Sequence, residues 1–308
     1  MDDQNVRNVM ESREWFNLAA NTLKEGDVAT IEGKPHTRAD CLAKALDLNP
    51  EFPQAWKGLA LWMQEADTFT IGGKKYVRRD CFVEVVKALP EDGESWNNLA
   101  IRVNVNEKLE INDKSYSDKD LYILAAENGA DLFFAWFNLA TDAMKGDESV
   151  TIKGKKFNRV DCYAKTVTIQ PRFPDGWKQL GLAMKTDEKI TVNGTEYTQR
   201  ESFFEVVKMN PADGEAWNNI AIRVPHGETV SIDGADYSDK DLYVKAAEKS
   251  PTLFYAWFNL ANDCMKAADE TVEVDGKPLT KIDCFAKALT LNPKFAEGWK
   301  QLGTPMKV

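Results

Sequence analysis

The amino-acid sequence predicts a mainly α-helical solenoid in which every repeat carries a β-hairpin. Three observations lead to this prediction: a Trp that returns every 40 to 42 residues, apolar residues at helical spacing on both sides of it, and an alternating segment with a two-residue turn in between. Repeats bury their core against their neighbours. The 308 residues therefore correspond to about seven and a half repeats in a single domain.

The recurring Trp predicts the first helix of each repeat, which we call helix A. An apolar residue follows at i+3 and Ala or Gly at i+4, a pattern typical of a helix packed closely on another. Trp62 alone lies outside this register. The Trp residues in register are Trp15, Trp56, Trp96, Trp136, Trp177, Trp217, Trp257 and Trp299.

A short alternating segment follows helix A and predicts a hairpin with a type I′ turn. Paired strands are about 4.8 Å apart and helices 8 to 10 Å apart, so we expect successive hairpins to join into one antiparallel ribbon. The central turn pairs are Glu32-Gly33, Gly72-Gly73, Asn112-Asp113, Lys153-Gly154, Asn193-Gly194, Asp233-Gly234 and Asp275-Gly276.

A second helix, helix B, is predicted after each hairpin. It begins at a Ser, Thr or Asn with an acid three residues later, as in Thr37 with Asp40, which is typical of a capping box. Val77 is the one start without such a cap. A Pro six residues before the next Trp, as at Pro50, ends the helix. The predicted repeats span 12–52, 53–93, 94–133, 134–173, 174–214, 215–254 and 255–295, with a half repeat at 296–308.

Composition argues against several classes of function. The net charge of −10 disfavours nucleic acid and anionic membranes as partners. The sequence contains no apolar run of membrane-spanning length and begins with a polar segment, so we expect a cytoplasmic protein.

Reactive side chains show no catalytic pattern. Cys41, Cys81, Cys162 and Cys284 share one repeat position, about 10 Å apart in neighbouring repeats, which is too far for a disulfide. We expect them to be buried and reduced. His36 and His226 have no ligand at metal-binding spacing, and no glycine-rich phosphate loop is present. The sequence therefore predicts no enzyme, no metal and no cofactor.

These motifs resemble the tetratricopeptide repeat over roughly residues 12 to 303. The shared pattern is Trp-x-x-Leu-Ala/Gly in helix A, Ala in helix B and Pro before the next Trp; the hairpin accounts for the greater length of each repeat. The resemblance implies a right-handed α-solenoid whose A helices line a concave groove for a peptide or helix of a partner. Some members clamp a C-terminal carboxylate with Lys and Asn. Lys57 with Asn98, and Lys178 with Asn219, match part of that pattern, but Leu61 and Leu182 replace its second Asn.

The residue after each Trp cycles through Phe, Lys and Asn with a period of 121 residues, and the resemblance implies that this position faces the groove. Either the cycle is a repeating set of ligand contacts, suited to an acidic partner, or it records the duplication of a three-repeat block. The candidate partner-binding residues are Phe16, Lys57, Asn97, Asn98, Phe137, Lys178, Asn218, Asn219, Phe258 and Lys300.

We therefore expect a non-catalytic scaffold that presents a groove to a protein or peptide. The alternative is a structural protein that self-assembles head to tail through its ends. Within the repeats, Arg102 and Arg223 are expected to form ion pairs with Asp142 and Asp263 of the following repeat.

Overall fold

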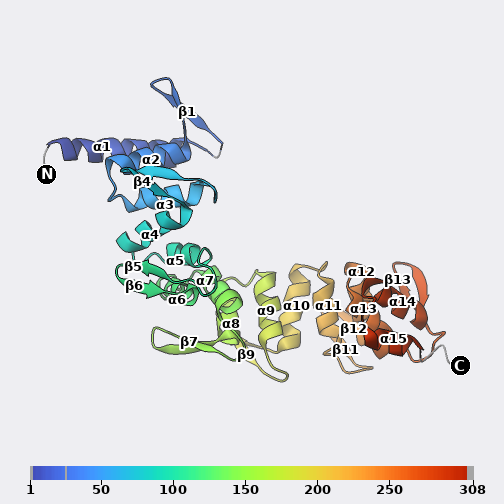
Figure 1. Cartoon of the computed structure of the whole chain (residues 1–308). Coiled ribbons are helices and arrows are strands. Elements are labelled where there is room, and N and C mark those ends of the chain that lie inside the picture. Colours follow the sequence, from blue (N-terminus) through green and yellow to red (C-terminus); the bar gives the residue numbers. More distant parts are fainter. Residues whose placement is uncertain (1–2, 25, 304–308) are drawn as a thin grey trace. The chain divides into compact units, whose positions relative to one another are not determined.

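The computed structural model describes residues 3–24 and 26–303 (Figure 1). The chain is mainly helical, and its helices alternate with antiparallel hairpins, as predicted. It divides into two compact units, Met1–Cys162 and Tyr163–Val308, with the boundary inside helix α8. Each unit is described by itself below.

In the first unit, two helices separate each hairpin from the next. The helices are α1 (Asp3–Asn17), α2 (Arg38–Leu48), α3 (Pro53–Trp62), α4 (Arg78–Ala88), α5 (Gly93–Ala100), α6 (Asp118–Asn128), α7 (Phe133–Asn138) and α8 (Arg159–Ile169), which ends in the second unit. The strands are β1 (Val28–Ile31), β2 (Lys34–Thr37), β3 (Phe69–Ile71), β4 (Lys74–Tyr76), β5 (Leu109–Ile111), β6 (Lys114–Tyr116), β7 (Ser149–Ile152) and β8 (Lys155–Asn158).

The second unit continues the same order. Its helices are α9 (Pro174–Ala183), α10 (Gln199–Met209), α11 (Gly214–Ala221), α12 (Asp239–Lys249), α13 (Phe254–Asn259), α14 (Lys281–Leu291) and α15 (Ala296–Gly303). Its strands are β9 (Ile190–Val192), β10 (Thr195–Tyr197), β11 (Thr229–Ile232), β12 (Ala235–Ser238), β13 (Thr271–Val274) and β14 (Lys277–Thr280).

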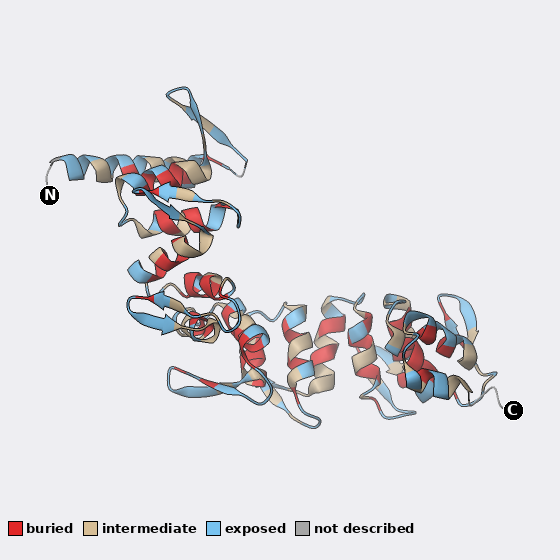
Figure 2. Ribbon diagram, in the orientation of Figure 1, coloured by how far each residue is buried: buried red, intermediate tan, exposed pale blue. Residues whose placement is uncertain are grey.

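Helices A and B pack alternately within each unit. Helix α3 packs on α4 of its own repeat and on α2 of the preceding one, and α11 packs in the same way on α12 and α10. Most buried residues lie in the helices, whereas the hairpins are mostly exposed (Figure 2). The apolar residue three positions after the Trp is fully buried in the second to seventh repeats, as at Leu59, Leu99 and Leu180.

The recurring Trp also ties helix A to the loop before it. The indole Nε1 of Trp56 donates to the carbonyl of Pro50 over 2.7 Å. The same bond recurs from Trp96, Trp177, Trp217, Trp257 and Trp299. Within the described residues, the buried Nε1 of Trp136, where Ala130 replaces the Pro, has no hydrogen-bond partner. The six-residue spacing from Pro to Trp is therefore explained by a structural hydrogen bond between helix A and the loop before it.

The predicted turns and caps are confirmed. Both central residues of all seven predicted turns have positive φ, for example 48° at Asn112 and 60° at Asp113, as a type I′ turn requires. Thr37 and Asp40 form a reciprocal capping box. At Val77 only half of the box forms, because the Asp80 carboxylate accepts the Val77 N–H over 3.1 Å while valine offers no acceptor in return.

The predicted ribbon is wrong. Within the described residues the hairpins form seven separate two-stranded sheets. The hairpins instead contact helix B. Strand β3 contacts α2, β7 contacts α6 and β13 contacts α12 of the preceding repeat, and β2, β4, β6, β10, β12 and β14 contact helix B of their own repeat. The turn is fastened there as well, since the amide of Gly72 donates to Asp47 Oδ1 over 2.9 Å. Each hairpin is thus held against a helix rather than against the next hairpin.

Helix A ends in a π-helical turn in the first, fourth and seventh repeats, which the sequence did not predict. These turns are η1 (Leu18–Thr22), η2 (Leu139–Ala143) and η3 (Leu260–Cys264). The amide of Leu23 donates to Leu18 O, five residues back, whereas Met63 donates to Leu59 O, four residues back. These three repeats are also longer than 40 residues, so the π turn holds one inserted residue and keeps Leu23, Met144 and Met265 buried.

Candidate functional site

The residue after each recurring Trp, the junction position, contacts the following repeat in most of the repeats. The first kind of contact at the junction position is between aromatic rings. The rings of Phe16 and Phe52 lie 4.8 Å apart between centroids, as do those of Phe258 and Phe295. Phe258 is buried and also contacts Phe285. Such pairs contribute packing beyond the area they bury.

The second chemistry is ionic. Lys57 Nζ lies 2.9 Å from Asp92 Oδ2 and 2.8 Å from Glu94 Oε2, at the start of the next helix A. Lys178 Nζ repeats this arrangement, 3.1 Å from Asp213 Oδ2 and in contact with Glu215. Burial by itself lowers the pKa of Lys57 and Lys178. The paired carboxylates raise it by more than burial lowers it, so both pKa values lie above the ordinary lysine value.

The third chemistry is an amide pair. Asn138 Nδ2 donates to the side-chain oxygen of Asn97 over 3.0 Å, and Asn259 does the same to Asn218 over 3.1 Å. The other two predicted Asn residues bond within their own helix: Asn98 Nδ2 donates to Glu94 O and Asn219 Nδ2 to Glu215 O.

Two candidate residues remain. Phe137 occupies the junction position of α7 and is half-buried. Lys300 is exposed in α15, with its Nζ 3.5 Å from Glu297 of the same helix. Of the ten candidates, six contact the next helix A within their unit: Phe16, Lys57, Asn97, Lys178, Asn218 and Phe258. The cycle of Phe, Lys and Asn thus matches a cycle of junction chemistries, and the partners change with it.

A different set of residues stands outward from the A helices. Five positions after the recurring Trp lie Leu61, Ile101, Leu182 and Ile222, and two positions before it lie Phe134 and Tyr255. These apolar side chains are between 39% and 49% exposed. We call Leu61, Ile101 and Phe134 the first apolar triplet, and Leu182, Ile222 and Tyr255 the second.

Carboxylates around the triplets reach further into solvent than the cations that bind them. Lys57 is 28% exposed and its partner Glu94 is 51% exposed. Arg102 is 13% exposed against 63% for Glu65, and Lys178 is 19% exposed against 55% for Glu215. These carboxylates are all paired: Glu65 binds Arg78 as well as Arg102, Glu94 binds Lys57, and Glu215 binds Lys178.

The expected ion pairs of Arg102 and Arg223 with Asp142 and Asp263 do not form. Arg102 binds Glu65 of the preceding repeat over 2.6 Å, and Arg223 donates to Gln199. The carboxylates instead accept from buried tyrosines: Tyr122 Oη donates to Asp142 over 3.1 Å and Tyr243 Oη to Asp263 over 3.0 Å. The Tyr hydroxyls come from helix B of the preceding repeat and occupy the place that the Arg side chains were expected to take.

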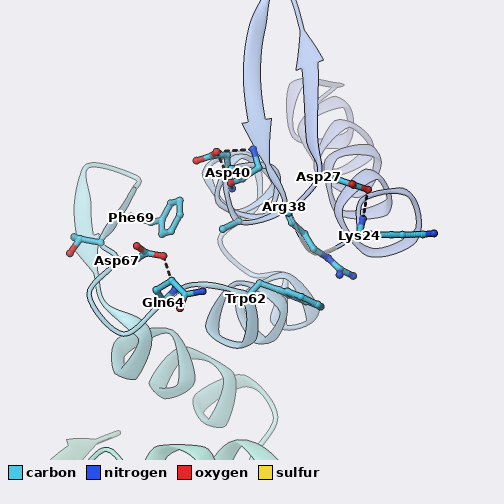
Figure 3. A pocket seen from close by; sticks show the side chains of 12 residues that line it. Lys24, Asp27, Arg38, Asp40, Trp62, Gln64, Asp67 and Phe69 are labelled. Carbon is cyan, nitrogen blue, oxygen red and sulfur yellow. Dashed lines mark hydrogen bonds between the residues drawn. The ribbon is translucent and has the colours of Figure 1, made fainter.

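A pocket of about 430 Å³ opens beside the start of α2 (Figure 3). The guanidinium of Arg38 lies 3.8 Å from the centroid of the Trp62 ring, the Trp outside the repeat register. Asp27 and Asp67 each accept a backbone N–H three residues earlier in their own loops. Equivalent bonds close other loops of the chain, as between Lys185 and Glu188, so these carboxylates are explained by loop structure.

The cysteines are buried and form no disulfide, as predicted. Burial raises the pKa of Cys81, Cys162 and Cys284 to about 12, so these thiols stay protonated. The structure also brings together three residues that the sequence did not connect. His226 Nδ1 lies 2.8 Å from Asp239 Oδ2, and Cys264 Sγ lies 3.5 Å from the same oxygen. Burial, and after it the negative charge of Asp239, raise the pKa of the Cys264 thiol. The thiol therefore stays protonated and is not a thiolate nucleophile.

Among the described residues, no group of three or more His, Cys, Asp or Glu is arranged to hold a metal ion. Over residues 3–24 and 26–303, no helix has both the length and the apolar character needed to cross a bilayer. No model of a known protein family matches the chain, and no curated protein matches it.

Proposed function

We propose that this chain is a non-catalytic scaffold that binds a protein or peptide through the outward side of its A helices. The proposal includes a right-handed α-solenoid of the tetratricopeptide type, supported by the alternate packing of helices A and B within each unit. It also includes a cytoplasmic location, which the five unpaired thiols favour because that compartment keeps thiols reduced.

The observation that carries the proposal is the pair of exposed apolar triplets. These six exposed side chains recur at equivalent positions of the A helices in both units, which scattered exposed apolar residues need not do. Leu61, Ile101, Leu182 and Ile222 lie outside the buried core, whereas Tyr255 also contacts Phe295 of the following repeat, with 6.1 Å between ring centroids. A surface for a partner accounts for them.

The junction contacts bear on the nature of the partner. Lys57 and Lys178 each meet two carboxylates, so the positive charge that would attract an acidic ligand is already neutralised. The partner we propose therefore meets apolar side chains rather than a cationic groove.

Capture from a lysate of the source cells tests the scaffold. The wild-type chain is compared with a variant carrying Leu61→Glu, Ile101→Glu, Leu182→Glu and Ile222→Glu. The matched control carries Thr141→Glu and Asn262→Glu, which occupy the same register five residues after Trp and are already exposed and polar. We expect one protein, identified by mass spectrometry, to be retained by wild type and control and lost from the quadruple variant. Equal capture by all three chains would contradict the proposal.

Head-to-tail assembly makes a different prediction and is separated by light scattering. A scaffold keeps the same mass as its concentration rises, whereas open-ended contacts give a mass that grows with concentration. Circular dichroism of each variant shows whether a lost interaction reflects unfolding.

A further inference from the structure

We propose that a pocket in the second unit binds a carboxylate, which takes the place that the side chain of Glu65 has in the first unit. The pocket has a volume of about 500 Å³ and is lined by the loop between α9 and β9, by the start of α10 and by the two residues after α11. This inference goes beyond the proposed function and does not depend on it, because it concerns a small ligand that is tested on the chain alone.

In the first unit, the chain supplies the carboxylate itself. Glu65 Oε1 lies 3.1 Å from Arg78 Nη1 and 2.6 Å from Arg102 Nη2. Arg79, which follows Arg78 in α4, lies with its Nη1 2.6 Å from Glu107 Oε1. Each of these three arginines therefore has a carboxylate partner.

The second unit keeps two of these arginines without their carboxylate partners. Arg200 and Arg223 stand 121 residues after Arg79 and Arg102, and both line the pocket. Thr186, which lines the same pocket, stands 121 residues after the glutamate that binds Arg102. Among the described residues, neither Arg200 nor Arg223 forms an ion pair.

Glu228 corresponds to Glu107 by position but does not bind Arg200. The Glu107 carboxylate is held by the backbone N–H of Asn104 over 3.0 Å. Pro225 takes the place of Asn104 and has no N–H to donate. The carboxylate of Glu228 therefore lacks the bond that positions its counterpart in the first unit.

Both arginines keep unused donors. Arg223 donates through its Nε and Nη1, whereas its Nη2 has no acceptor within the described part of the chain. In Arg102 the Nη2 atom is the one that binds Glu65. The guanidinium of Arg200 lies 5.9 Å from the centroid of the Phe204 ring, and its Nε has no hydrogen-bond partner. Burial lowers the pKa of Arg223, and no carboxylate offsets this effect.

A carboxylate suits this pocket better than a phosphate. Guanidinium groups bind carboxylates through paired N–H donors. The exposed Asp187 also lines the pocket, and its negative charge repels a doubly charged phosphate about twice as strongly as a singly charged carboxylate. Ile222 is 49% exposed and gives the pocket an apolar wall against which the methylene groups of a Glu side chain can pack.

Nuclear magnetic resonance of the arginine Nε–H groups tests this inference. The probe is N-acetylglutamate N-methylamide, whose single carboxylate imitates that of Glu65, and its neutral glutamine analogue is the control. We expect the glutamate probe to shift the signals of Arg200 and Arg223 in a saturable manner, and the glutamine analogue to shift neither. The signals of Arg79 and Arg102 should not move, because carboxylates of the chain already bind these side chains.

Two substitutions should exchange the behaviour of the two units. Thr186→Glu places a carboxylate of the chain itself in the pocket, so the saturable shift at Arg223 should be lost. Glu65→Thr removes the carboxylate from the first unit, so Arg102 should then respond to the probe. Thr191→Glu is the matched control, because Thr191 is exposed in β9 and does not line the pocket. It should bind the probe as the wild type does.

Three outcomes would overturn the inference in chains that circular dichroism shows to be folded. The first is the absence of a saturable shift at Arg223 in the wild type. The second is equal binding of the probe by the wild type and Thr186→Glu. The third is a saturable shift with inorganic phosphate but none with the glutamate probe, because the pocket would then select a different anion.

Discussion

At the scale of single residues, the side chains at the junction position mostly make contacts within the chain, between one helix A and the following repeat. Lys57 and Lys178 sit between two helices A with their ammonium groups against two carboxylates each. A partly buried charge that loses its partner costs more than an exposed pair contributes. The Phe and Asn residues at the same position make aromatic and amide contacts in its place.

Lys178→Met is therefore expected to lower the free energy of unfolding by about 1 to 2 kcal/mol, because Asp213 is left without its cation in a partly buried place. Lys189→Met is the matched control. Lys189 and its partner Glu196 are both mostly exposed, so this change should cost less than about 0.5 kcal/mol. Urea unfolding followed by circular dichroism measures both. Equal losses would show that Lys178 contributes no more than a surface lysine.

The same variant has a pH dependence of known sign. The pKa of Lys178 is raised in the folded protein, so its contribution is fully present below the ordinary lysine pKa of about 10.4 and is lost as pH rises through the raised value. The difference between wild type and Lys178→Met should therefore be constant from pH 6 to 9 and shrink above about pH 10.5.

Sequence reasoning identified the junction residues, but it did not identify that most of them face the following repeat rather than solvent. Trp and the apolar residue at i+3 define the buried side of a helix from spacing alone. Whether the residue at i+1 meets solvent or the next helix depends on how closely the A helices approach, which one repeat does not encode. The acid partners Asp92 and Glu94 were visible in the sequence, and their recurrence 121 residues later as Asp213 and Glu215 was the available signal.

At the scale of elements, the π turns explain why three repeats are longer than the others. Repeats that keep the 40-residue spacing end helix A with a bond four residues back, or with a tighter turn at Arg102 and Val103. Repeats one and four are one residue longer and repeat seven is two residues longer. In the first and fourth, the turn closes five residues back, at Leu23 and Met144. The inserted residue is thus absorbed before the hairpin begins.

Deleting Thr141 is expected to convert the fourth repeat to the regular form. The sequence then runs Trp-Phe-Asn-Leu-Ala-Asp-Ala-Met, which places Met144 seven residues after Trp, as Met184 is after Trp177. We expect the melting temperature to change by less than about 4 °C, since this corresponds to roughly 1 kcal/mol or less in a chain of this size. Thermal unfolding by circular dichroism measures the change.

Deleting Leu182 provides the comparison, because α9 has no π turn to give up. The deletion moves Met184 from its buried position and should lower stability by about 2 kcal/mol or more. If both deletions cost the same, the π turn does not hold an inserted residue.

The hairpins mark the limit of prediction from local pattern. Turn pairs such as Asn112-Asp113 specified the hairpins, because few sequences accept positive φ at both central positions. The ribbon failed because strand spacing shows only that two hairpins fit side by side. The bond from Gly72 to Asp47 and the contact of β3 with α2 place the hairpin against a helix, and neither is a local property.

At the scale of the whole molecule, the junction residues and the apolar triplets both follow one period of 121 residues. It appears inside each unit as the order of aromatic, ionic and amide junctions, and outside as one apolar triplet per unit. We propose that the two sets of residues make separate contributions: changes at the junctions act on stability, and changes at the triplets act on binding.

Photo-crosslinking tests this account most directly. A benzophenone-bearing residue is placed at position 101 or 222 in the triplets, and at position 141 or 262 as controls in the same register. With the native partner in an extract of the source cells, we predict a crosslinked product from positions 101 and 222 and none from 141 and 262. Crosslinks from the control positions alone, or from a hairpin position such as 34 in place of 101 and 222, would contradict the claim that the apolar triplets are the binding surface.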